Sequence, residues 1–146
     1  IAAERGSRIA ELTIEIEEAD TGLNRAKEKG NRLFEEQKKI AEDVLLTDGQ
    51  RIKAAQEAQR ILKETEKIQI DQLDRQIKLA KIKTEANDTS LADKKEIEEL
   101  EAKKEALVAT GIGKSIELRN KENAIIKTRI DTVRKAQEAE RSDLKS

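Results

Sequence analysis

Apolar residues recur along the first 86 positions at alternating spacings of three and four. With heptad position a set at Ile9 and position d at Leu12, 16 of the 23 a and d positions are apolar. About 8 would be expected from the 36% apolar content of the whole chain. A sustained heptad repeat is typical of a coiled-coil helix. We therefore predict one continuous heptad helix over residues 1–86.

The tetrapeptide 47–50, Thr-Asp-Gly-Gln, is the weak point of this helix. Asp-Gly is a common turn dipeptide, and Thr47 with Gln50 fits a capping box, which together favour a helical hairpin. The heptad phase nevertheless continues across the tetrapeptide, and a hairpin loop has no need to preserve it. The continuous helix is the preferred prediction. The hairpin alternative stays open, and it would bring the regions of Leu33 and Leu62 close together.

Two further interruptions are expected in the second half of the chain. Residues 87–90, Asn-Asp-Thr-Ser, compete with helical backbone hydrogen bonds and predict a break or a stutter. A second long helix follows over 91–146, and Gly111 with Gly113 predicts a kink at 111–113. Its apolar residues fall into two phases. One begins at Ile97, and the other, one or two positions later, comprises Ile112, Ile116, Ile126, Ile130, Val133 and Leu144.

Composition narrows the fold class. Asp, Glu, Lys and Arg make up 42% of the 146 residues, Phe34 is the one aromatic residue, and Pro is absent. Globular domains average about 25% charged residues, so this chain is too polar to enclose one compact core. The net charge of −1 and the abundance of strong helix formers argue against a disordered chain. The prediction is an all-α, elongated coiled coil of very long helices, about 220 Å long if helical throughout.

A single amphipathic helix cannot bury its own apolar stripe, so the chain is expected to form a homo-oligomer, a dimer or a trimer. The oligomer seam is predicted from the apolar heptad positions and from their continuation in the second helix. Its residues are Ile9, Leu12, Ile16, Leu23, Leu33, Ile40, Val44, Ile61, Ile68, Leu79, Ile82, Ile97, Leu100, Leu107, Ile126, Ile130 and Val133.

The sequence offers little that could perform chemistry. Without His or Cys there are no zinc ligands of those types, no thiol nucleophile and no imidazole base. Residues 111–115, Gly-Ile-Gly-Lys-Ser, match the end of a P-loop, but Val108 stands where the first glycine belongs. We predict that the chain is not an enzyme and has no catalytic, cofactor-binding or metal-binding residue.

The charge pattern bears on partners. Basic residues alternate with acidic ones, and one aromatic residue provides no stacking platform, so nucleic-acid binding is not expected. No stretch approaches the 18–20 apolar residues of a membrane span, so no membrane partner is expected either. The remaining partners are further copies of the chain and other structural proteins of an assembly.

Residues 94–104, and residues 125–131 running into 136–141, resemble the helical stretches of phage tail tape-measure proteins. The resemblance implies a virion protein that lies in the tail lumen as a parallel oligomeric coil and whose length sets the tail length; otherwise a cytoplasmic location is expected. The expected function is that of a structural spacer, scaffold or ruler. Two alternatives stay open: a helical-hairpin protein-interaction module, and the coiled-coil arm of a larger ATPase.

Overall fold

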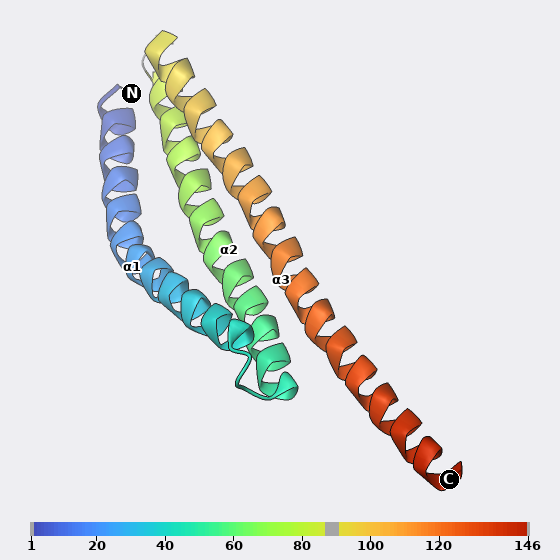
Figure 1. Ribbon diagram of the computed structural model, residues 1–146. Helices are drawn as coiled ribbons and strands as arrows, with labels where there is room; N and C mark the ends of the chain where they lie inside the picture. The colour runs from blue at the N-terminus through green and yellow to red at the C-terminus, as the bar shows by residue number, and fades with distance from the viewer. Residues whose placement is uncertain (1, 87–90, 146) are drawn as a thin grey trace.

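The computed structural model describes residues 2–86 and 91–145, with side chains for 6–85 and 94–144. Within these residues the chain forms three long helices and no strand: α1 (Ala2–Glu42), α2 (Asp48–Ala86) and α3 (Leu91–Lys145). Helix α2 lies between α1 and α3 and packs against both, so the helices form a row (Figure 1). The all-α fold class is confirmed, but the helices fold back on one another.

The prediction of a continuous helix over residues 1–86 is wrong, because the chain turns between Glu42 and Asp48. Thr47 and Gln50 form the capping box: the Gln50 backbone N–H donates to Thr47 Oγ1 at 3.2 Å, and the Thr47 N–H donates to Gln50 Oε1 at 3.1 Å. These reciprocal bonds satisfy two donors at the start of α2. Asp43 Oδ1 accepts from the Leu45 N–H at 3.0 Å, which stabilises the turn before it.

Side chains close to this turn also satisfy the end of α1. Arg51 occupies a heptad a position, where an apolar residue would be expected. Its Nε donates to the backbone carbonyl of Ala41 at 2.9 Å. A cationic donor at a helix C-terminus satisfies a free carbonyl and complements the helix dipole. Arg51 therefore joins the two helices across the turn.

Polar and small residues set the antiparallel register of α1 and α2. Gln72 Nε2 donates to Asn24 Oδ1 at 3.1 Å, and Gly30 lies against Thr65. A Cβ on Gly30 would overlap the Thr65 hydroxyl and lie 3.5 Å from its Cβ, so glycine permits the close approach. The same register brings Leu33 opposite Leu62, the approach expected of a hairpin. Next to the turn, Ala41, Ala54 and Ala55 form a small buried cluster.

Most of the predicted seam residues are partly or fully buried within this one chain. Ile61 is buried, and most of the others are half-buried. Val44 is an exception at 78% exposure, because it lies in the turn and not in a helix. Ile130 and Val133 are also exposed. The half-buried members are Ile9, Leu12, Ile16, Leu23, Leu33, Ile40, Ile68, Leu79, Ile82, Ile97, Leu100, Leu107 and Ile126.

Helix α3 runs antiparallel to α2 and continues without interruption through residues 111–113, so the predicted kink or break there is wrong. Gly111 is buried, and a Cβ on it would overlap the Glu66 carboxylate of α2. The glycine thus serves helix packing rather than a change of direction. Polar contacts follow the same interface: Lys104 pairs with Asp74 at 2.7 Å, and Gln56 donates to Glu122 at 2.9 Å.

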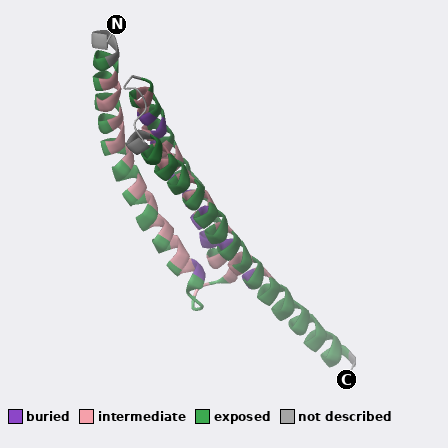
Figure 2. Cartoon of the chain, turned by 90° about the horizontal axis from the view of Figure 1, so that it is seen from above, coloured by how far each residue is buried: buried purple, intermediate pink, exposed green. Residues whose placement is uncertain are grey.

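The expected break or stutter at residues 87–90 lies outside the described residues. Helix α3 is the longest helix, with 55 residues and a length of about 82 Å. Its residues 127–144, which we call the α3 arm, are all exposed, and the end of the arm projects past the turn between α1 and α2 (Figures 1 and 2). The folded chain is therefore far shorter than the 220 Å of a continuous helix.

Candidate interaction surface

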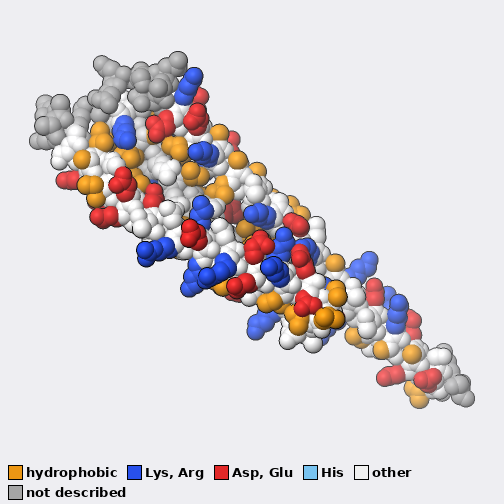
Figure 3. All heavy atoms as spheres, turned by 60° about the vertical axis from the view of Figure 1, so that its left-hand side comes forward, with side chains coloured by type: hydrophobic (Ala, Val, Ile, Leu, Met, Phe, Trp, Pro, Cys, Tyr) orange, Lys and Arg blue, Asp and Glu red, His pale blue; other side chains and the backbone are white. Residues whose placement is uncertain are grey.

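The chemical candidates of the sequence do not converge on a site. Residues 111–115 lie inside α3, so their backbone N–H groups belong to a helix rather than to a loop that could surround a phosphate. Across residues 2–86 and 91–145, no group of three or more His, Cys, Asp or Glu side chains is placed to hold a metal ion. Acidic and basic side chains are interspersed over the face shown in Figure 3.

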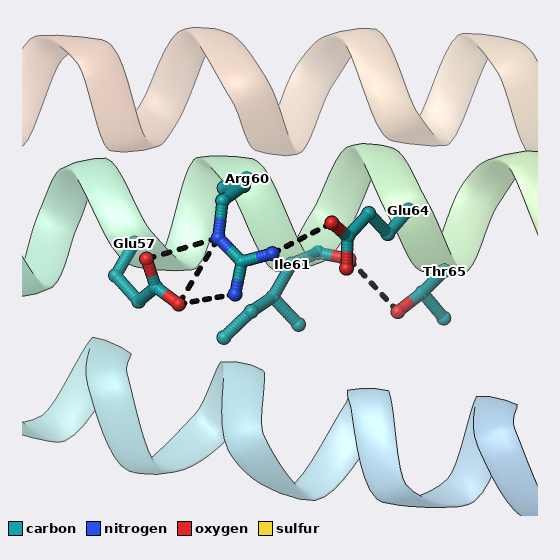
Figure 4. Close-up of polar contacts among 5 residues, drawn as sticks. All are labelled: Glu57, Arg60, Ile61, Glu64 and Thr65. Atoms are coloured by element: carbon teal, nitrogen blue, oxygen red, sulfur yellow. Dashed lines mark hydrogen bonds and ion pairs between the residues drawn. The ribbon is translucent and has the colours of Figure 1, made fainter.

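The most connected charged group lies on α2 (Figure 4). The Arg60 guanidinium donates to Glu57 through Nε at 3.0 Å and to Glu64 through Nη1 at 2.6 Å. The hydrogen bond from Arg60 lowers the pKa of Glu57, and the hydrogen bond with Glu57 raises the pKa of Arg60. All three side chains are exposed to solvent by 40% or more. Pairs at these helical spacings stabilise a helix and do not by themselves make a binding site.

Two contacts connect α1 to α3 across the row. Lys121 is paired with Glu42, and this hydrogen bond lowers the pKa of the Glu42 carboxyl. Lys114 Nζ lies 5.9 Å from the centre of the Phe34 ring, within the range of a cation–π contact. Both contacts come from one side of α3. They hold the helix against the hairpin and leave its opposite side free.

That opposite side carries the largest set of exposed apolar residues in the described chain. Ile112, Ile116, Ile130 and Val133 are between 51% and 56% exposed, and Ile126 is half-buried between them. We call these five residues the α3 stripe. Ile112 and Ile130 are eighteen residues apart, which is five helical turns, so they lie on one line along α3. Leu144, 87% exposed, continues the same face to the end of the arm.

An open groove between α2 and α3 runs beside the N-terminal end of the stripe. Asp74, Ile77 and Lys81 of α2 face Ala109 and Ile112 of α3 across it. The groove meets the stripe at Ile112, and its lining combines apolar residues with charged ones such as Asp74 and Lys81. Such a surface suits an amphipathic helix better than a small molecule, because it is open along its whole length.

The sequence located part of this surface. The second apolar phase contains all five stripe residues, but only Ile126, Ile130 and Val133 were assigned to an oligomer seam. The predicted seam does not include Ile112 and Ile116. The sequence does not predict the groove, because the residues on its α2 side depend on which face of α2 packs against α3.

No protein-family model matches the chain, and neither does any curated protein or solved structure. No helix of the described chain is both long and apolar enough to cross a membrane. The functional proposal therefore rests on the exposed surface of α3.

Proposed function

We propose that this chain is a non-catalytic helical scaffold that presents the α3 stripe to another helix. The observation that carries the proposal is the exposure of Ile112, Ile116, Ile130 and Val133 along one side of α3. Before the α3 arm begins, another side of this helix packs against α2. These side chains contribute little to the fold of the chain itself. Contiguous exposed apolar residues with polar borders commonly mark a protein-binding surface.

The spacing of the stripe indicates the kind of partner. Ile126, Ile130 and Val133 follow the i, i+4, i+7 pattern by which one helix anchors against another. The stripe lies on an uninterrupted helix, so its anchors are held in fixed positions relative to one another. A partner helix would remove these side chains from water, at roughly 25 cal/mol per Å² of apolar surface.

The proposal is tested by photo-crosslinking of the full-length protein in its own cells. A photoreactive amino acid replaces Ile130 on the stripe or, as a matched control, Thr132, which is exposed on another side of α3. We expect a protein adduct of defined mass at position 130 that disappears when Ile116 is also replaced by Glu, and no adduct at 132. Absence of the adduct at 130, or equal adducts at both positions, would contradict a helix-binding stripe.

The resemblance to tape-measure proteins supplies a second candidate function, that of a spacer. Helix α3 favours it, because the resembling stretches 94–104, 125–131 and 136–141 all lie on this single helix of 55 residues. In this case, deletion of whole heptads from α3 in the complete protein should shorten the assembly in proportion. An unchanged assembly length would exclude the ruler function.

A further inference from the structure

We propose that the helix bound by the α3 stripe is the α3 stripe of a second copy of this chain, packed antiparallel about a twofold axis near residue 121. The inference rests on the proposed function and names its partner. In this arrangement the numbers of facing residues add up to 242. Among antiparallel alignments, it is the one in which all four isoleucines of the stripe meet isoleucines of the second copy.

The positions of the stripe are arranged symmetrically about residue 121. Along α3 its face contains positions 109, 112, 116, 119, 123, 126, 130 and 133, at alternating spacings of three and four. In the antiparallel alignment, Ile112 faces Ile130 of the second copy and Ile116 faces Ile126. Ala109 faces Val133, which places a small residue against a larger one. Each pair occurs twice, as a twofold contact requires.

The centre of the stripe is polar, and it determines the orientation. Arg119 faces Asn123 of the second copy, whose side-chain oxygen can accept from the guanidinium. Glu122 borders Asn123 and lies within reach of the same guanidinium. Gln59 of α2 donates to Glu122 at 3.0 Å and holds this carboxylate at the border of the stripe. A central polar layer of this kind specifies one register among several apolar ones.

Other alignments bring like charges together. In a parallel pair Arg119 would face Arg119 of the second copy inside the seam. In the antiparallel register that places Ile126 on Ile130, facing numbers add up to 256, so the bordering Lys127 would meet Arg129 of the second copy. Like charges in facing positions are destabilising, most of all where water is excluded. The charge pattern therefore selects the alignment about residue 121.

The same alignment gives the α3 arm a place to lie. Beyond Val133, Gln137 and Arg141 of the arm reach Glu105 and Glu101 of the second copy, which line its groove between α2 and α3. The basic side chain of Arg141 would thus meet Glu101, whose carboxylate also lies 3.8 Å from Lys81 Nζ in the same groove. Each arm would cover the groove between α2 and α3 of the other copy.

The first test measures the mass of the full chain by sedimentation equilibrium. We expect a dimer for the wild type. Ile130→Glu should raise its dissociation constant about 100-fold or more, because the new carboxylate enters the seam twice. The matched variant Thr132→Glu, on another side of α3, should leave the constant unchanged. A wild-type chain that stays monomeric up to its solubility limit would overturn the proposal, and so would an equal effect of both variants.

The second test measures orientation by disulfide formation, for which the chain is suited because it has no native Cys. Equal amounts of Ile116→Cys and Ile126→Cys chains are mixed and oxidised. We expect the mixed 116–126 dimer to dominate, and Glu117→Cys, on another side of α3, to remain uncrosslinked. A majority of 116–116 and 126–126 dimers would show a parallel pair and overturn the alignment.

The two proposals can fail separately. A monomeric chain that still gives an adduct at position 130 with a different protein refutes self-association and leaves the scaffold function standing. A monomeric chain without any adduct at that position refutes both.

Discussion

The end of the hairpin next to its turn and the α3 arm both carry apolar residues, but their surroundings are opposite. At the turn, Ala41, Ala54 and Ala55 bring α1 and α2 close together, and Arg51 satisfies the last turn of α1. On the arm, isoleucine and valine face solvent at the same heptad spacing. The alanines next to the turn are thus buried, whereas Ile130 and Val133 of the arm are about half exposed.

A heptad stripe therefore shows which face of a helix can pack, but it does not show which partner that face packs against. Around Ile61, the stripe of α2 meets the stripe of α1, and the side chain is 5% exposed. Around Ile130 the same kind of stripe meets no other helix of the described chain, and the side chain is 52% exposed. A core and a binding surface can therefore share one sequence pattern, and their mutational effects separate them.

The sharpest separation should come from one substitution made in both regions. Ile61→Ala should lower the free energy of unfolding by about 2–5 kcal/mol, because it opens a cavity between α1 and α2. Ile130→Ala should change that free energy by no more than about 0.5 kcal/mol. Urea denaturation of dilute, monomeric protein measures both. Equal losses at the two positions would mean that the arm belongs to the core.

The second prediction concerns two glycines of α1. Gly30→Ala should destabilise the hairpin by about 1 kcal/mol, since the new methyl group overlaps the buried Thr65 hydroxyl. Gly22→Ala should stabilise it by about 0.5–1 kcal/mol, because its Cβ enters open space and alanine favours the helix. Thermal unfolding gives both signs, and Thr65→Ala should relieve the loss at Gly30. A gain in stability from both substitutions would contradict the close approach of Gly30 to Thr65.

The third prediction tests the turn. Thr47→Ala should cost about 1 kcal/mol, because the capping bond to the Gln50 N–H is lost. The same change at Thr132 on the arm, where the hydroxyl bonds the Thr128 carbonyl inside a helix, should have almost no effect. Chemical denaturation of the two variants provides the comparison. A loss of stability for Thr132→Ala as large as that for Thr47→Ala would contradict a stabilising role of the capping box at the turn.

The smallest effect should be the pH dependence of the contact between Glu42 and Lys121. The hydrogen bond from Lys121 lowers the pKa of Glu42 in the folded chain. Its contribution is therefore complete above the unfolded pKa of Glu, about 4.3, and is lost as the pH falls through the lower folded value. Both groups are partly exposed, so we expect only a few tenths of a kcal/mol. Wild type and Lys121→Gln should converge in stability at low pH; a constant difference would exclude the linkage.

Much of the fold could be predicted from the heptads, and one error had a specific cause. The seam positions do face inward on both α1 and α2, and Thr47 with Gln50 was recognisable as a capping box. The unbroken heptad phase across the turn led to the wrong prediction of a continuous helix. Each helix has its own heptad phase, and the turn has a number of residues that keeps the two phases in step. The buried environment of Gly111 could not be predicted, since the space beside the glycine is occupied by the Glu66 carboxylate of a different helix.

The candidate surface was predictable in part for the same reason. The second phase of α3 identified the stripe as a set of residues on one face. Its exposure depends on where α2 and α1 lie around α3, and contacts such as Lys114 with Phe34 determine that arrangement. Such contacts join residues about 80 positions apart and leave no periodic trace in the sequence.

The central feature of the fold is that the heptad faces of α1 and α2 pack against each other within one chain. Spin labels on cysteines replacing the exposed Lys29 and Lys67 test it by pulsed electron resonance, in labelled protein diluted with unlabelled chain. Adjacent packed helices lie about 8–10 Å apart, so the hairpin predicts label distances within about 20 Å. A continuous helix would place the same labels about 57 Å apart, and that result would contradict the fold.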